Sequence, residues 1–396
     1  MKRVLLFLFL VASSLHGFAQ LNGNGYYRVK SYDNGRYVSL IDNRGSINVS
    51  TTEADMAALR TVLGFERIVS DPSTIIYIKK MSTGYDLQAQ GTGSYAIISY
   101  EVLISPTGDG TYWAYASKGV MSKYLADEVI SWMWPATDSR RIYGNMVGVS
   151  KPSSTQADWY ILPVAADGDN YFGITPSVSA GGAYYQSFYA AFPFTFSSTG
   201  MSAYYVSQVD AAKSAVVIKE VTGGVPSTTP VIIKCSSDQP ASNKLNIGAA
   251  TTGSASGNLL KGVYFCNNDV ESEKHRNVVA YNSETMRVLG TAADGSLAFV
   301  KSTTLQYIPA NTAYITVEAG APDVLKVYTQ AEYDALPSAK RGDLSGDGKV
   351  SGLDLVYLGN MILGTREKTT DADLNGDGKV SGLDYVILVN IILNQQ

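Results

Sequence analysis

Histidine is almost absent from this 396-residue chain, which contains only His16 and His275. A zinc enzyme that binds its metal through several imidazoles is therefore excluded by count. A serine or cysteine hydrolase with a histidine base would have to use His275, because His16 lies in an N-terminal leader described below. His275 sits in a charged run typical of a solvated loop, and no Gly-x-Ser-x-Gly turn occurs.

Charge is also scarce, since charged residues make up 17% of the chain and the net charge is only -4. This composition offers no basic stripe for nucleic acid and no polybasic patch for a membrane surface. No apolar run is long enough to span a bilayer. The chain is instead rich in glycine and tyrosine, with 37 and 27 residues, and in Ser, Thr and Val. This profile predicts a mainly β, secreted protein.

The first 19 residues have the pattern of a secretory signal peptide. Lys2 and Arg3 precede an apolar run over residues 4–11, and small and polar residues follow as far as Ala19. We expect cleavage after Ala19, and no lipid anchor, because no Cys lies near that point. The protein is therefore expected outside the cytoplasm, either secreted or held at the cell surface or in the periplasm.

The chain has two cysteines, Cys235 and Cys266, each at the end of an apolar, strand-like run. An exported compartment permits a disulfide between them. Two separate buried thiols are equally compatible with these surroundings. The sequence leaves both alternatives open.

The length is too great for a single core and predicts two or three domains after the leader. We place a first β domain at residues 20–166, a second at 167–336 and a small C-terminal module at 340–394.

Residues 21–166 contain three similar units, each an alternating strand, a Gly-containing turn and a second strand, followed by a closing strand. The hairpins lie at 25–40, 75–87 and 110–125, and the closing strands at 64–69, 99–104 and 158–163. This arrangement resembles the β-trefoil of ricin-type lectins. The resemblance implies a trefoil-like domain that binds carbohydrate.

Two tryptophans in the third unit are candidates for a sugar-stacking surface. Trp132 and Trp134 are two residues apart, so an extended segment would place them on one face. Aromatic rings suit the C–H faces of sugars, and Asp138, Arg140 and Arg141 follow closely and could bind hydroxyl groups. The alternative is that both tryptophans plug the open end of the trefoil.

Residues 167–336 predict a second all-β domain, because turn signals separate short β-branched and aromatic runs. Expected strands include 185–194, 201–206, 215–219, 230–234, 258–262 and 308–316. The order resembles a sandwich-like accessory module of exported bacterial proteins, which implies a spacer or stalk.

The C-terminus carries two near-identical twelve-residue stretches, 343–354 and 373–384. Each has the oxygen-bearing residues of a calcium loop at positions 1, 3, 5, 9 and 12, a backbone carbonyl at position 7 and Gly at position 6. The predicted ligands are Asp343, Ser345, Asp347, Lys349, Ser351 and Asp354 in the first loop, and Asp373, Asn375, Asp377, Lys379, Ser381 and Asp384 in the second. We therefore expect two Ca²⁺ ions.

Each loop is followed by one helical pattern, and Pro337 argues against a helix entering the first loop. Two Asp-closed loops with one helix each resemble the type I dockerin module. The resemblance implies a cohesin-type partner, bound through residues that include Gly352, Leu353, Gly382 and Leu383. We also expect the apolar faces that begin at Leu353 and Leu383 to pack against each other.

These features favour a secreted, non-catalytic binding protein that serves polysaccharide breakdown. One alternative is a glycoside hydrolase, since such enzymes need two carboxylates and no histidine. No carboxylate pair stands out, however, and neither β domain has the size of a typical catalytic barrel. A second alternative is a trefoil protease inhibitor that presents one exposed loop.

Overall fold

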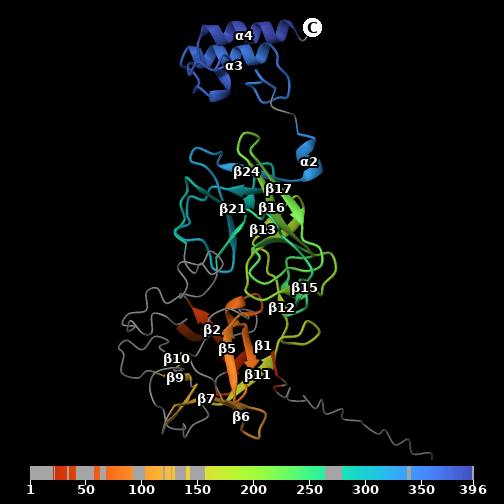
Figure 1. Cartoon of the computed structure of the whole chain (residues 1–396), viewed down its shortest axis with the longest axis vertical. Helices are drawn as coiled ribbons and strands as arrows, with labels where there is room; N and C mark the ends of the chain where they lie inside the picture. The colour runs from red at the N-terminus through yellow and green to blue at the C-terminus, as the bar shows by residue number, and fades with distance from the viewer. Residues whose placement is uncertain are drawn as a thin grey trace, which may run out of the picture.

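The structure is a computed structural model, and it describes residues 21, 23–33, 35–41, 58–62, 68–91, 103–118, 121–125, 127–129, 140–142, 157–263, 279–336 and 340–394. It confirms the mainly β fold with a helical module at the C-terminus (Figure 1). The predicted leader at 1–19 lies outside the described residues. In the described part of the chain, no helix is both long and apolar enough to cross a bilayer.

The N-terminal region forms a nine-stranded sheet. Its strands are β1 (Gly25–Ser31), β2 (Tyr37–Ile41), β3 (Ala58–Val62), β4 (Ile76–Lys80), β5 (Tyr85–Ala89), β6 (Leu103–Pro106), β7 (Tyr112–Lys118), β8 (Met121–Tyr124) and β11 (Trp159–Pro163). Two further strands, β9 (Asp127–Val129) and β10 (Arg140–Ile142), pair with each other. The three predicted hairpins are confirmed as β1–β2, β4–β5 and β7–β8.

The last strand of this region returns to the first. β11 runs antiparallel to β1, from Tyr27 opposite Pro163 to Ser31 opposite Trp159, and it also meets β7 where Trp159 faces Tyr112. Trp159 is fully buried, and its indole N–H donates to the Leu125 carbonyl at 2.9 Å. The third predicted closing strand is thus confirmed. The trefoil as a whole stays a prediction.

The first predicted closing strand is wrong at its described end. Ile68 is helical and residues 69–70 form a turn, in which the Asp71 amide donates to the Ile68 carbonyl at 3.1 Å. The Asp71 side chain then caps η1 (Pro72–Thr74) by accepting from the Ser73 amide. Pro72 favours this first-turn position because its ring fixes φ and it lacks an amide hydrogen. Residues 68–74 thus form two consecutive turns, and residues 64–67 of the predicted strand lie outside the described residues.

The central region contains a three-stranded and a ten-stranded sheet. The small sheet has the order β12 (Phe172–Gly173), β19 (Lys244–Ile247), β15 (Phe194–Phe196). The large sheet has the order β13 (Val178–Ala180), β14 (Ala183–Phe188), β18 (Val231–Cys235), β16 (Ser202–Asp210), β17 (Ala215–Glu220), β24 (Val324–Thr329), β22 (Leu297–Val300), β21 (Met286–Thr291), β23 (Ala313–Thr316), β20 (Lys261–Gly262). Pairing is antiparallel except between β17 and β24. A one-turn helix, η3 (Pro240–Ser242), precedes β19.

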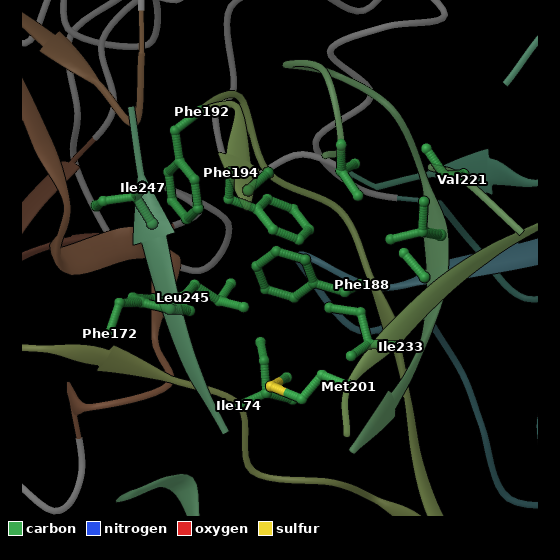
Figure 2. Close-up of a cluster of buried hydrophobic side chains, with 14 of the residues drawn as sticks. Phe172, Ile174, Phe188, Phe192, Phe194, Met201, Val221, Ile233, Leu245 and Ile247 are labelled. Carbon is green, nitrogen blue, oxygen red and sulfur yellow. The ribbon is translucent and has the colours of Figure 1, made fainter. Parts of the chain in front are cut away.

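One buried segment, residues 188–192, belongs to the cores of both β regions. Its side chains alternate, as in an extended chain. Tyr189 and Ala191 pack into the N-terminal core with Trp159, whereas Phe188 and Phe192 pack into the central core. Figure 2 shows the latter two rings gathered with Phe172 and Phe194. This one segment therefore packs the two regions against each other.

A buried arginine ties the same two regions together. Arg28, on β1, is 0% exposed. Its guanidinium donates to the Tyr171 carbonyl and the Asn170 side chain at 2.8 and 2.9 Å, and to the Ile68 carbonyl at 3.1 Å. Burial lowers the pKa of Arg28 to about 10. The group remains charged at neutral pH and is stabilised by oxygens from both sides of the junction.

Four short helices follow the β sheets: α2 (Gln330–Asp334), α3 (Gly352–Ile362), η4 (Thr370–Ala372) and α4 (Gly382–Leu393). α2 starts at Thr329, which forms a reciprocal cap with Glu332. α3 and α4 lie side by side in the C-terminal module, beyond the end of the β sheets (Figure 1).

Candidate functional site

Each C-terminal loop folds around its first carboxylate. The two oxygens of Asp343 accept hydrogen bonds from the Gly346 and Gly348 amides, both at 2.8 Å. Asp373 accepts the equivalent bonds in the second loop at 2.8 and 2.7 Å. The sixth position turns back through φ of +80° in the first loop and +82° in the second. Glycine is needed there because a side chain would strain a left-handed backbone.

The twelfth position joins each loop to its helix. Asp354 is fully buried and accepts the amides of Ser345 and Ser351, both at 2.7 Å. Asp384 is buried in the same way and accepts the amides of Leu374 and Ser381, both at 2.8 Å. These contacts close the loop and at the same time satisfy the first free amides of the helix.

The hydrogen bonds from backbone amides determine the charge state of Asp354 and Asp384. Burial acts to raise the pKa of Asp354, but the amide bonds from Ser351 and Ser345 outweigh it and hold the pKa below its usual range. The same balance, with bonds from Ser381 and Asn375, lowers the pKa of Asp384. Both carboxylates are therefore ionised at neutral pH.

The helices begin where they do because a serine caps each one. Ser351 and Ser381 have extended backbones, and each accepts from the amide two residues later, at 3.2 Å. The partner in each reciprocal cap is the buried aspartate at the third helical position. An acid in the first turn also suits the helix dipole.

The middle positions of the loops complete an oxygen-rich set. Asp347 and Asp377 accept the amides of the seventh-position lysines, both at 2.8 Å. Ser345 contacts Asp343 at 3.3 Å, and Asn375 contacts Asp377 at 2.9 Å. The structure thus brings the twelve predicted ligand residues together in two equivalent loops.

The donor set fits calcium, a hard cation that takes six to eight oxygens. Oδ2 of Asp343 and Oδ2 of Asp373 each accept one amide and keep acceptor capacity for a cation, whereas Oδ1 of Asp384 accepts two amides. Within the described ranges, no three carboxylate, imidazole or thiol side chains gather closely enough to hold a metal by themselves. A cation in either loop would therefore also draw on hydroxyl, amide and main-chain oxygens at positions 3, 7 and 9.

The helices bury a different face from the predicted one. Leu353 and Leu383 are 47% and 56% exposed, so the prediction that the packed faces begin there is wrong. The module core is formed by Leu358, Met361 and Leu388, packed with Val350 and Leu374. The caps explain the difference, because Asp354 and Asp384 point inward and the residues four positions later lie on the same side.

The exposed residues repeat between the two helices. Val356 follows Leu353 by one turn and is 57% exposed, and Val386 follows Leu383 in the same way and is 55% exposed. Gly352 and Gly382 precede these pairs and have open space where a side chain would lie. Each helix therefore presents an exposed apolar pair beside a glycine. The glycine and the leucine are at the positions predicted for partner binding, whereas Val356 and Val386 were not among the predicted partner-binding residues.

Contacts between the repeats were not foreseen from the sequence. The Arg341 guanidinium donates to the Leu374 carbonyl, and the Lys368 ammonium donates to the Val380 carbonyl at 3.1 Å. Gly342 lies against Leu388, and a Cβ there would come within 2.6 Å of the leucine side chain. Arg341, Gly342 and Lys368 lie outside the two loops, so the loop spacing alone could not have revealed these contacts.

The structure describes only some of the remaining predicted site residues. Trp132, Trp134 and Asp138 lie outside the described residues, and Arg140 begins β10, where it pairs with Val129. Cys235 is buried with a free thiol, and burial raises its pKa to about 12. Cys266 lies outside the described residues, so a disulfide between the two cysteines stays a prediction.

Comparison with known families identifies the C-terminal module. Residues 341–393 match the dockerin type I domain, so this part of the chain is a type I dockerin, as predicted. No curated protein matched the chain. Dockerins generally bind calcium, are typically extracellular and imply a cohesin partner. The module therefore supports docking to a cohesin within a polysaccharide-degrading assembly.

Proposed function

We propose that this chain is a secreted, non-catalytic binding protein that docks to a cohesin-type module through a dockerin loaded with two calcium ions. In this proposal the N-terminal trefoil-like domain, residues 20–166, binds carbohydrate, and the central domain, residues 167–336, acts as a spacer. The leader at 1–19 directs export. The observation that carries the proposal is the type I dockerin at 341–393, with its repeated exposed apolar pairs.

The two loops supply the calcium sites of this proposal. When bound, calcium offsets the mutual repulsion of three carboxylates in each loop. The chain's own residues shape the sites: Asp343 and Asp373 hold the turn amides, while Asp354 and Asp384 anchor the helix starts. The remaining ligands are Ser345, Asp347, Lys349 and Ser351 in the first loop, and Asn375, Asp377, Lys379 and Ser381 in the second.

The exposed pairs supply the docking surface. Leu353 with Val356, and Leu383 with Val386, offer apolar area that the dockerin core leaves uncovered. Gly352 and Gly382 have no side chain and would let a partner backbone approach closely. Because the two pairs are equivalent, either helix could make the same contact.

The carbohydrate-binding and non-catalytic parts of the proposal rest on the sequence. Trp132 and Trp134, with Asp138 and Arg140, form the predicted stacking surface. His275 is the only histidine after the leader, and neither β domain has the size of a typical catalytic barrel.

Calorimetric titration of the full chain with a panel of recombinant type I cohesin modules tests the docking. We expect one or more cohesins to bind in calcium and not in EGTA. The L353D/L383D double variant should lose about 100-fold in affinity, because it places charges at the centre of both docking pairs. Each single variant should lose much less, since one intact pair remains.

L259D provides a matched control, because Leu259 is an exposed leucine of the central region, 41% accessible. It should bind like the parent chain. The docking proposal fails if no cohesin in the panel binds, or if a cohesin binds equally well without calcium.

A further inference from the structure

The outer side of the N-terminal sheet carries aromatic side chains that neither the core nor the dockerin uses. Along β7, Tyr112 and Ala114 belong to the N-terminal core. Since side chains alternate along a strand, Trp113 and Tyr115 point to the opposite side, where both are half-buried. Tyr124, on β8, lies opposite Tyr115 and shares its face. These three residues are called the aromatic face below.

The three rings of the aromatic face are held against one another. Tyr115 and Tyr124 stack with ring centroids 5.0 Å apart and an interplanar angle of 27°. Trp113 meets Tyr124 edge to face, with centroids 6.3 Å apart. The rings are thus fixed by the sheet and by each other before any ligand arrives, which lowers the entropy lost on binding.

Oxygen atoms lie at the edges of these rings. The indole N–H of Trp113 donates to Oδ1 of Asp158 at 2.6 Å, and the Tyr115 hydroxyl lies 3.3 Å from Oγ of Ser105. Among the contacts of the described residues, none occupies Oδ2 of Asp158 or the Tyr124 hydroxyl. The face therefore combines flat apolar rings with oxygens that retain hydrogen-bonding capacity.

A second pair of rings extends this side of the sheet along β11 toward β1. Asp158 and Tyr160 flank the buried Trp159, so both lie on the outer side. Tyr32, which is 44% exposed, has its ring centroid 5.7 Å from that of Tyr160. The aromatic surface is thus longer than a single small-molecule site.

We propose that the aromatic face binds a polysaccharide chain, with sugar rings stacked on Trp113 and Tyr124 and sugar hydroxyls bonded to Asp158. Sugars have apolar C–H faces and polar edges, and this surface offers both kinds of partner. An extended row of rings suits a polymer of sugars. The inference rests on the proposed carbohydrate binding and names a site separate from Trp132 and Trp134.

β6 and β7 lie at the end of the β sheets away from the dockerin (Figure 1). The aromatic face and the dockerin could therefore bind their partners at the same time.

Native affinity electrophoresis of the full chain tests the site, with xyloglucan, arabinoxylan, galactomannan or amylopectin in the gel. We expect at least one polysaccharide to retard the parent chain. W113A and Y124A should each weaken binding about tenfold, because each removes a stacking ring. Y124F should bind nearly as well as the parent, since it keeps the ring. Y307A, which removes an exposed tyrosine of the central region, is the matched control and should not change binding.

The outcomes separate this site from the proposed function. If W113A and Y124A bind like the parent while W132A or W134A loses binding, carbohydrate binding stands and the aromatic face is wrong. If no polysaccharide retards the parent, both carbohydrate proposals fail, and cohesin docking is judged by its own titration. Circular dichroism checks the fold of each variant. If the alanine variants unfold, D158N tests the site instead, because this substitution removes no aromatic ring. Unchanged affinity of D158N for the polysaccharide would then overturn the inference.

Discussion

At the scale of single residues, the fold of the dockerin depends on two aspartates, each of which makes two kinds of contact. Asp354 and Asp384 close their loops and cap their helices through the same pair of oxygens. The sequence predicted these positions as metal ligands, because the loop spacing is a local pattern. It did not predict their complete burial, which depends on how the loops fold back over the module core.

These aspartates should make the dockerin sensitive to acid when calcium is absent. Their folded pKa values lie below the ordinary value of about 3.9 expected for the unfolded chain. Their stabilising contribution is therefore complete above about pH 4 and is lost as the pH falls through the lower, folded values. In calcium-free buffer, helical circular dichroism of the full chain should decrease over that range.

The matched control for this pH prediction is the D354N/D384N variant. Asparagine cannot ionise, so the acid-dependent part of the loss should be smaller, although the variant starts from a less stable helix. An identical acid transition in the parent and the variant would show that these two carboxylates are not the groups responsible.

Removal of a first-position aspartate should abolish one calcium site. D343A loses a ligand and also the acceptor of the two glycine amides that shape the first loop. Calorimetric titration should show a fall from about two to about one calcium ion per chain, and D373A should behave alike. D371N, beside the second loop but outside its pattern, is the control and should keep both sites. Unchanged stoichiometry in D343A would contradict the ligand assignment.

At the scale of elements, sequence periodicity predicted the two helices but not which side of each is buried. α4 is apolar around most of its circumference, so the pattern of Leu383, Val386 and Ile387 is compatible with several faces. The cap at Asp384 fixes the rotation of α4 about its own axis. Leu388 is therefore buried in the module core and Leu383 is exposed. The spacing of apolar residues alone does not show how the cap rotates the helix.

Two leucines of α4 should therefore respond differently to truncation. Leu388 is fully buried in the module core, so L388A should destabilise the calcium-loaded dockerin by about 2–5 kcal/mol. Leu383 is mostly exposed, so L383A should change stability by less than about 0.5 kcal/mol. Urea unfolding followed by helical circular dichroism measures both. Equal losses of stability in the two variants would contradict the assignment of inner and outer faces.

At the scale of the whole molecule, the two β regions are linked more closely than their sequence suggests. A boundary near residue 166 follows from turn signals, and the two large sheets share no strand. Yet residues 188–192 pack into both cores, and Arg28 bonds across the junction. Turn signals indicate where strands end. They cannot show that alternate side chains of one apolar segment pack into two different cores.

The junction also holds residues in left-handed backbone conformations. Gln90 and Asn311 have φ of +61° and +58°, which is costly for residues other than glycine. The Asn311 side chain donates to the Gln90 side chain at 3.2 Å and to the Tyr189 carbonyl at 3.0 Å, and the Ala191 amide also donates to Gln90 at 3.2 Å. These bonds offset the backbone cost and bind the N-terminal region to the central one.

This linkage predicts that a change in the central region alters the unfolding of the N-terminal region. All four tryptophans lie between residues 113 and 159, so tryptophan fluorescence reports on the N-terminal region alone. N311A removes both side-chain bonds and puts alanine in a left-handed conformation, so it should cost about 1–3 kcal/mol. The fluorescence midpoint in urea should then fall together with the β-sheet signal in circular dichroism. V324A, at the start of β24, is the control because the Val324 side chain is 37% exposed, and it should change neither signal. A fluorescence midpoint that stays fixed in N311A while the β-sheet signal falls would show that the two regions unfold independently.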